Sequence, residues 1–344
     1  MEYCVVAKNK FSLRLTCQKL FFTLSIVLTL CNTTKAQDAE FSQFLNAPLY
    51  LNPAFAGVGI GPRFIANYRN EWGAINHAYT TYSVSYDQDI NKLNGGIGVS
   101  AFADEQGNGL YSQLQFTGFY SYQFNMNKNY ALKMGASAAY SQLKIDYANF
   151  IFYDMIDQSS VSVTQSTQEN SPAVLTKSYA DFGAGFLLYS KKLFFGLGIK
   201  HLTQPNISFY NNTEKSQLPT RYALHFGYEF KKNKRSKSFF APNCLLVQQG
   251  RFRQLNFGAM TGAGVLIAGI NYRHTITNPD AFTFIFGVKK GVFKTAYSYD
   301  ITTSGLKGRS GGTHEISIAM NFGERKNAIQ QRRLKRYTEC PDIF

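Results

Sequence analysis

Apolar and polar side chains alternate along most of the chain. Between residues 220 and 230, Tyr222, Leu224, Phe226 and Tyr228 occupy every second position. The same period recurs in the stretches 77–87, 109–124 and 312–322. Because successive side chains of a β-strand point to opposite faces, this period predicts strands with one apolar face.

Counting such stretches predicts fourteen strands across residues 63–322. Their expected centres are Ile65, Val84, Val99, Phe116, Ala136, Gly185, Leu197, Leu224, Leu246, Phe257, Gly269, Phe284, Tyr297 and Ile318. An even number of strands is typical of single-chain bacterial outer-membrane barrels. We therefore expect an all-β fold, a transmembrane antiparallel β-barrel with both termini in the periplasm.

The connections between these strands differ in length according to their order. The long ones, residues 146–178, 202–219 and 301–311, are all odd-numbered, whereas the even-numbered ones are short except for the basic stretch 231–238. Outer-membrane barrels have long extracellular loops and short periplasmic turns. The odd-numbered connections are therefore expected to be extracellular.

Composition favours the membrane barrel over a soluble β-sandwich or a lipocalin-like barrel. Aromatic residues make up 15% of the chain and charged residues 17%, so intrinsic disorder is excluded. A soluble sheet would carry charge on its second face. In this chain the second face is rich in Gly, Ala, Ser, Thr and Gln instead.

The first 36 residues have the pattern of a signal peptide. Basic residues precede the apolar stretch 20–31, and small residues at Thr34 and Ala36 predict cleavage between Ala36 and Gln37. A retained anchor helix is disfavoured because the apolar stretch falls short of the ~20 residues that a membrane helix needs. A lipid-attachment site at Cys31 is disfavoured because Leu30 before it is bulky.

Charged residues within the predicted strands are expected to face the lumen. An Arg or Lys that faces lipid near the midplane costs ~2–4 kcal/mol. The candidates are Arg69, Lys133, Lys200, Arg221, Glu229, Arg273, Lys294 and Asp300. They form either a set of ion pairs that hold the barrel or a basic lining that attracts anions.

Two segments without alternation flank the predicted barrel. Residues 37–62 hold an apolar cluster closed by Pro53 and Gly57, which predicts a short helix and a turn in the periplasm. This segment would either plug the periplasmic mouth or pack against the first strand. Residues 323–344 form a basic tail that is helical in composition.

The tail and the turn 231–237 together predict a positive periplasmic face. Its basic residues are Lys231, Lys232, Lys234, Arg235, Lys237, Arg332, Arg333, Lys335 and Arg336. Such a charge run is either simply solvated, in contact with anionic lipid headgroups, or a docking surface for an acidic periplasmic partner. Nucleic acid is not expected as a partner, because the compartment is wrong.

The sequence offers little for catalysis or metal binding. It contains no CxxC or HExxH motif. The five histidines, at positions 77, 201, 225, 274 and 314, suggest no nucleophile and base pair. Cys244 and Cys340 follow the signal peptide, and their spacing leaves open whether they pair. We expect no enzyme activity.

Several stretches resemble the PorP/SprF family of the type IX secretion system. FSQFLNAPLYLNPAFAG at 41–57 is similar to that family's N-terminal signature, which assigns the motif positions Leu49, Asn52, Pro53, Ala54 and Gly57. The stretches 68–72, 81–87 and 314–317 extend the resemblance over nearly the whole chain after residue 36.

The resemblance implies an outer-membrane barrel without cofactor or catalytic residues that works in type IX secretion and often in gliding motility. Members support export or surface attachment of cargo, notably large adhesins, so secretion-system subunits and a secreted cargo are the implied partners beside outer-membrane lipid. A porin or small-molecule transporter that prefers anions is the alternative. We further expect the Asn52–Pro53 turn to seat the N-terminal segment on the barrel.

Overall fold

The computed structural model describes residues 37–322 except 60, 76, 128, 158–161, 164–165, 173, 211–215, 232–235, 237, 276–278 and 306–307. The chain divides after Ala36 into two compact units, and all described residues belong to the second. The predicted signal peptide and basic tail lie outside the described residues, as do all the predicted docking residues except Lys231.

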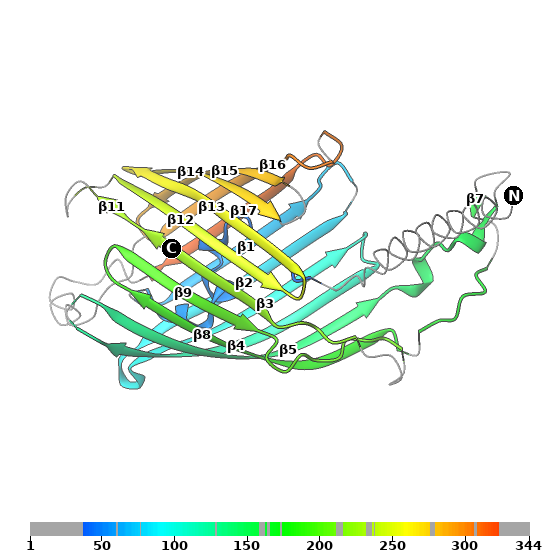
Figure 1. Ribbon diagram of the computed structural model, residues 1–344, viewed down its shortest axis with the longest axis horizontal. Coiled ribbons are helices and arrows are strands. Elements are labelled where there is room, and N and C mark those ends of the chain that lie inside the picture. Colours follow the sequence, from blue (N-terminus) through cyan, green and yellow to red (C-terminus); the bar gives the residue numbers. More distant parts are fainter. Residues whose placement is uncertain are drawn as a thin grey trace, which may run out of the picture. The chain divides into compact units, whose positions relative to one another are not determined.

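Within the described residues, fourteen long antiparallel strands form one closed barrel (Figure 1). These strands are β1 (Arg63–Glu71), β2 (Tyr79–Ile90), β3 (Gly95–Gln106), β4 (Tyr111–Asn125), β5 (Ala131–Ile145), β8 (Thr176–Tyr189), β9 (Leu193–Lys200), β10 (Arg221–Tyr228), β12 (Phe239–Gln249), β13 (Phe252–Ala263), β14 (Leu266–Thr275), β15 (Pro279–Lys290), β16 (Phe293–Thr302) and β17 (Thr313–Asn321). The short β11 (Phe230–Lys231) follows β10 and pairs with β12. The barrel closes where β1 pairs with β17. This confirms the predicted fold, and each predicted centre lies in a different strand.

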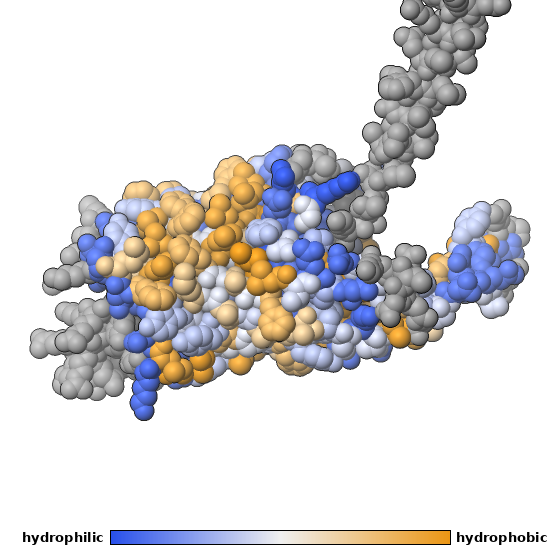
Figure 2. Space-filling view, turned by 60° about the horizontal axis from the view of Figure 1, so that its bottom comes forward, coloured by the Kyte–Doolittle hydropathy of each residue, from blue (hydrophilic) through white to orange (hydrophobic). Residues whose placement is uncertain are grey.

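The alternation in the sequence becomes an inner and an outer face of the barrel wall. In β10, Arg221, Ala223 and His225 are buried, whereas Tyr222 and Leu224 are exposed. Figure 2 shows hydrophobic residues gathered on the outer wall. An exposed apolar band of this kind is stable against lipid, because the hydrocarbon core removes it from water.

The strand order gives the barrel two unlike ends. The connections 146–175, 201–220 and 303–312 lie at one end, called here the long-loop end. The short connections, such as 190–192 and 264–265, lie at the opposite, short-turn end. At the short-turn end β1 begins and β17 ends.

Small elements occupy some of these connections. The turn after β2 holds η3 (Asn91–Leu93), and the connection from β5 to β8 holds η4 (Tyr147–Asn149), η5 (Tyr153–Met155) and the hairpin of β6 (Ile156–Asp157) and β7 (Ser162–Val163). No helix among the described residues is both long and apolar enough to cross a membrane.

Residues 38–58, called here the luminal segment, lie inside the barrel. They fold into η1 (Phe44–Asn46), α2 (Pro48–Leu51) and η2 (Pro53–Phe55). Asp38 contacts His201 at the long-loop end, and the Gly57 amide donates to the Asp87 carboxylate, three residues before β2 reaches the short-turn end. The luminal segment therefore runs from one end of the lumen to the other.

The sequence predicted that residues 37–62 lie in the periplasm and that both termini lie on that side of the membrane. The path of the luminal segment differs from this prediction. The described chain begins at the long-loop end, and β17 ends at the short-turn end. An even strand number fixes only where the strands themselves begin and end. The segment before β1 is free to return through the lumen, where its apolar side chains leave water.

Candidate functional site: the filled lumen

The Asn52–Pro53 turn attaches the luminal segment to the barrel wall. The fully buried Asn52 side chain accepts a hydrogen bond from the Ala54 amide at 2.8 Å and donates one to the Phe186 carbonyl of β8 at 2.9 Å. Pro53 is the first residue of η2, where its fixed φ suits a helix start. One amide side chain thus caps a helical turn and fixes it to β8.

Four inward-facing glycines, called here the glycine cradle, contact this turn and its neighbours. They are Gly96 on β3, Gly135 on β5, Gly185 on β8 and Gly198 on β9. A Cβ atom on any of them would overlap the luminal segment, for example on Gly185 at 2.9 Å from the Pro53 ring. The cradle therefore permits an approach between backbones that no other residue allows.

Gly57 closes the path at the short-turn end. Its φ of +62° belongs to the left-handed region, and a Cβ atom would lie 2.6 Å from the Gly96 Cα atom. Its amide donates to Asp87, and Asp87 also pairs with Arg63 at 2.9 Å. Glycine is therefore required here for both conformation and space.

Glu315 is the centre of a buried charge cluster nearer the long-loop end. Its carboxylate accepts hydrogen bonds from the Ser42 and Gln43 amides at 2.8 and 3.1 Å, and Arg69 lies 3.4 Å away. Asp300 lies 3.0 Å from Arg273 and 3.8 Å from Arg69. Two wall carboxylates and two wall arginines thus compensate one another and orient the luminal backbone.

We expect the Glu315→Gln variant to destabilise the protein by about 3 kcal/mol or more, because it leaves a buried arginine short of charge compensation. Glu71→Gln is the matched control, since Glu71 also pairs with Arg69, at 3.0 Å, but its side chain is 32% exposed. That change should cost no more than about 1 kcal/mol. Urea unfolding in lipid vesicles measures both, and equal effects would contradict a special role for Glu315.

Three further predicted luminal cations contact the luminal segment. The fully buried Arg221 pairs with Glu40 at 2.6 Å. The Lys133 ammonium donates to the Ala56 carbonyl at 2.7 Å, and the Lys200 ammonium lies 3.2 Å from the centre of the Tyr50 ring. These cations bind the segment by an ion pair, a hydrogen bond and a cation–π contact.

Some of the remaining predicted residues are described by the structure, and others lie outside the described residues. Glu229 is buried and pairs with Lys231 at 2.8 Å, and Lys294 is buried in β16. Gln37 is exposed, whereas its predicted cleavage partner Ala36 is not among the described residues. Cys244 is a free, half-buried thiol, and Cys340 is outside the described part.

Asp38 and His201 anchor the first residues of the luminal segment. The His201 ring lies 2.9 Å from both the Asp38 and the Asp181 carboxylates. Burial alone would lower the pKa of His201, but the two carboxylates outweigh it and raise this pKa to about 9. Burial alone would raise the pKa of Asp38, but His201, Lys200 and Arg221 hold it well below its usual range. Both groups are therefore charged near neutral pH.

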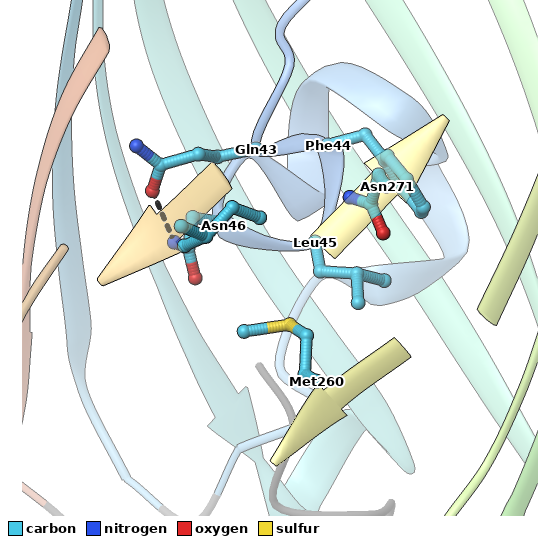
Figure 3. Close-up of a pocket in the computed structure, with 7 residues that line it drawn as sticks. Gln43, Phe44, Leu45, Asn46, Met260 and Asn271 are labelled. Atoms are coloured by element: carbon cyan, nitrogen blue, oxygen red, sulfur yellow. Dashed lines mark hydrogen bonds between the residues drawn. The ribbon is translucent and has the colours of Figure 1, made fainter. Parts of the chain in front are cut away.

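A small cavity lies between the luminal segment and the opposite wall (Figure 3). Leu45 of the segment faces Met260 of β13, with Asn271 of β14 beside them, and Asn46 donates to Gln43 at 2.7 Å. The lining consists of amide and apolar side chains. In the part of the chain that the structure describes, no three His, Cys, Asp or Glu side chains are grouped to hold a metal ion.

The glycine cradle, Asp87 and Glu315 are among the contact residues that sequence reasoning missed. A signal for the cradle existed, because glycines recur at every second position in 183–185 and 196–198, on the face that points inward. Paired glycines on one face of a strand indicate a close backbone approach. For Glu315 the signal was its position in the alternation of the last strand, because it precedes the outward-facing Ile316 and must therefore face inward.

Comparison with known proteins identifies relatives of the chain. The sequence profile of the family described as type IX secretion system membrane protein PorP/SprF matches residues 33–320. No curated protein sequence matches significantly.

Solved structures with a similar fold are outer-membrane proteins. The toluene transporter TodX of Pseudomonas putida is 12% identical, with 80% of this chain and 94% of that chain covered at a TM-score of 0.45. Omp33 of Acinetobacter baumannii is 6% identical, with 77% and 100% covered at a TM-score of 0.43. A FadL homologue of Pseudomonas aeruginosa is 12% identical, with 76% and 90% covered at a TM-score of 0.38. At these identities the likeness concerns the barrel fold alone.

Proposed function

The chain belongs to the PorP/SprF family of type IX secretion system membrane proteins, and on this premise we propose that it acts as a closed docking barrel. It is an outer-membrane β-barrel, and its family works with the other components of the secretion system. In the proposed role it supports export or surface attachment of an adhesin-like cargo, including cargo used in gliding. It does so by binding cargo or periplasmic subunits, without catalysis.

The observation that carries the proposal is the filled lumen. The luminal segment contacts the wall at both ends, and Phe44, Leu45, Leu49 and Phe55 are each at most 4% exposed. Burying such a side chain stabilises a fold by roughly 1.5–3 kcal/mol. A segment held in this way leaves the outer and periplasmic surfaces as the places where partners bind.

The same contacts argue against the alternative of an anion-preferring porin. Arg63, Arg69, Arg221 and Arg273 all pair with carboxylates inside the protein. Cations that are already compensated within the protein attract passing anions weakly. The paired arrangement supports the first of the two interpretations of the luminal charges.

We also propose that the long-loop end faces the cell exterior and the short-turn end the periplasm, following the general asymmetry of such barrels. At the short-turn end, the connections 91–94, 126–130, 190–192 and 232–238 carry eight Lys or Arg residues and no Asp or Glu. This charge supports a periplasmic docking face for an acidic subunit, to which the basic tail would contribute.

The proposal predicts that cells lacking the chain fail to display at least one type IX cargo on their surface. Re-expression of the full chain should restore display, and a variant without residues 323–344 should restore it poorly while its barrel remains folded. Surface proteomics of the three strains measures the cargo, and small-solute uptake serves as the control. Intact display together with reduced solute uptake would favour the porin instead.

A further inference from the structure

The connection between β5 and β8 is acidic, unlike the rest of the chain. Residues 146–175 hold four carboxylates and no Lys or Arg, in a chain with a formal net charge of +15. The carboxylates belong to Asp146, Asp154, Asp157 and Glu169. The connection projects from the long-loop end (Figure 1), and its described residues are called here the acidic arm.

Hydrogen bonds between its two halves give the acidic arm a defined shape. Asp154 accepts from the Gln168 amide at 2.7 Å and from the Thr167 hydroxyl at 3.1 Å. The Tyr147 hydroxyl donates to the Glu169 carbonyl at 3.0 Å. At its base, the Asp146 amide donates to the Leu110 carbonyl at 2.9 Å. A surface that is ordered in advance loses less entropy when a partner binds.

Large apolar side chains stand exposed among these carboxylates. Ile151 is 63% exposed, Tyr153 77% and Val163 52%. Figure 2 shows hydrophobic and hydrophilic residues side by side at the projecting end of the arm. Unlike the apolar residues of the barrel wall, these residues belong to the connection between β5 and β8, outside the fourteen barrel strands. Exposed aromatic anchors surrounded by charge are typical of protein interfaces.

We propose that the acidic arm is a docking surface for a basic protein at the cell exterior, one that presents Lys or Arg around an apolar pocket. The inference rests on the proposed function and names the outer partner's chemistry. The Tyr153 and Ile151 side chains of the acidic arm fill the partner's pocket, and the carboxylates of the arm steer and orient the partner. Anionic lipid phosphates and the acidic arm of a second copy are both repelled by like charge, so neither fits this surface.

Photocrosslinking in cells tests this inference with the full chain. A photoreactive phenylalanine analogue replaces Ile151, and mass spectrometry identifies the crosslinked segment. We expect a protein segment with a net positive charge. The variant with Asp157→Asn and Glu169→Gln should lower the crosslink yield by about tenfold, because charge complementarity raises association rates by such factors. Glu105→Gln, an exposed carboxylate of β3 outside the arm, is the matched control and should leave the yield unchanged.

Crosslinks to lipopolysaccharide, to another copy of the chain or to an acidic segment would overturn the inference. A yield that does not respond to the arm charges, or the absence of any crosslink, would do so too. Cargo display is scored in the same cells. If display is lost upon deletion of the chain but no charge-dependent crosslink forms, only the docking role of the acidic arm is refuted. If display stays intact upon deletion, the proposed function itself is refuted.

Discussion

Deleting residues 38–57 is expected to turn a closed barrel into a steadily conducting one. The segment occupies the lumen from the long-loop end to the short-turn end, while the strand pairs that form the wall involve none of its residues. Water should therefore fill the vacated lumen without opening the seam between β1 and β17. Single-channel recording in planar bilayers measures the change, and the unaltered protein should show no steady current.

A deletion of equal length, residues 149–168 in the acidic arm, is the matched control and should leave the barrel closed. Retained heat-modifiable migration on gels shows that each variant is folded. A peptide of residues 37–58 added from the long-loop side should reduce the current of the first variant, since the wall contacts of the segment are intact. A folded deletion variant that stays closed would show that the luminal segment is not the seal.

The strands could be predicted because their signal is local. Alternation in ten or so neighbouring residues is enough to identify a strand and its two faces. The Arg63 and Asp87 pair illustrates the limit of this signal, because it depends on the register between β1 and β2. A one-residue shift in register would separate them.

The path of the luminal segment could not be predicted, because its contacts join residues that are far apart in the sequence. The Ser317 hydroxyl donates to Gln43 across 274 positions. The turn at Asn52 and Pro53 was expected from the local preference of proline, but not its position inside the barrel. An apolar segment without periodicity packs equally well inside a lumen or against an outer strand, so only the three-dimensional contacts decide between the two.

Replacing Gly135 with leucine should release the luminal segment from the wall. A Cβ atom at this position meets the backbone of Pro53 and Ala54, which cannot rotate aside as the end of a side chain can. Overpacking of a tight interior typically costs about 1–3 kcal/mol. We therefore expect a lower urea midpoint and protease cleavage within residues 38–58, while the strands remain protected.

Gly118 provides the control for this change, since it also lies within a long barrel strand but faces outward. The nearest contact of a Cβ atom there is the Ala138 carbonyl oxygen at 4.0 Å, so Gly118→Leu adds an apolar side chain to the lipid-facing surface. Both substitutions restrict the unfolded chain to the same degree, so the difference between them isolates the contact with the luminal segment. Equal urea midpoints and equal protease patterns would mean that the cradle does not hold the segment. A loss confined to Gly135→Leu would mean that the close backbone approach keeps the lumen filled.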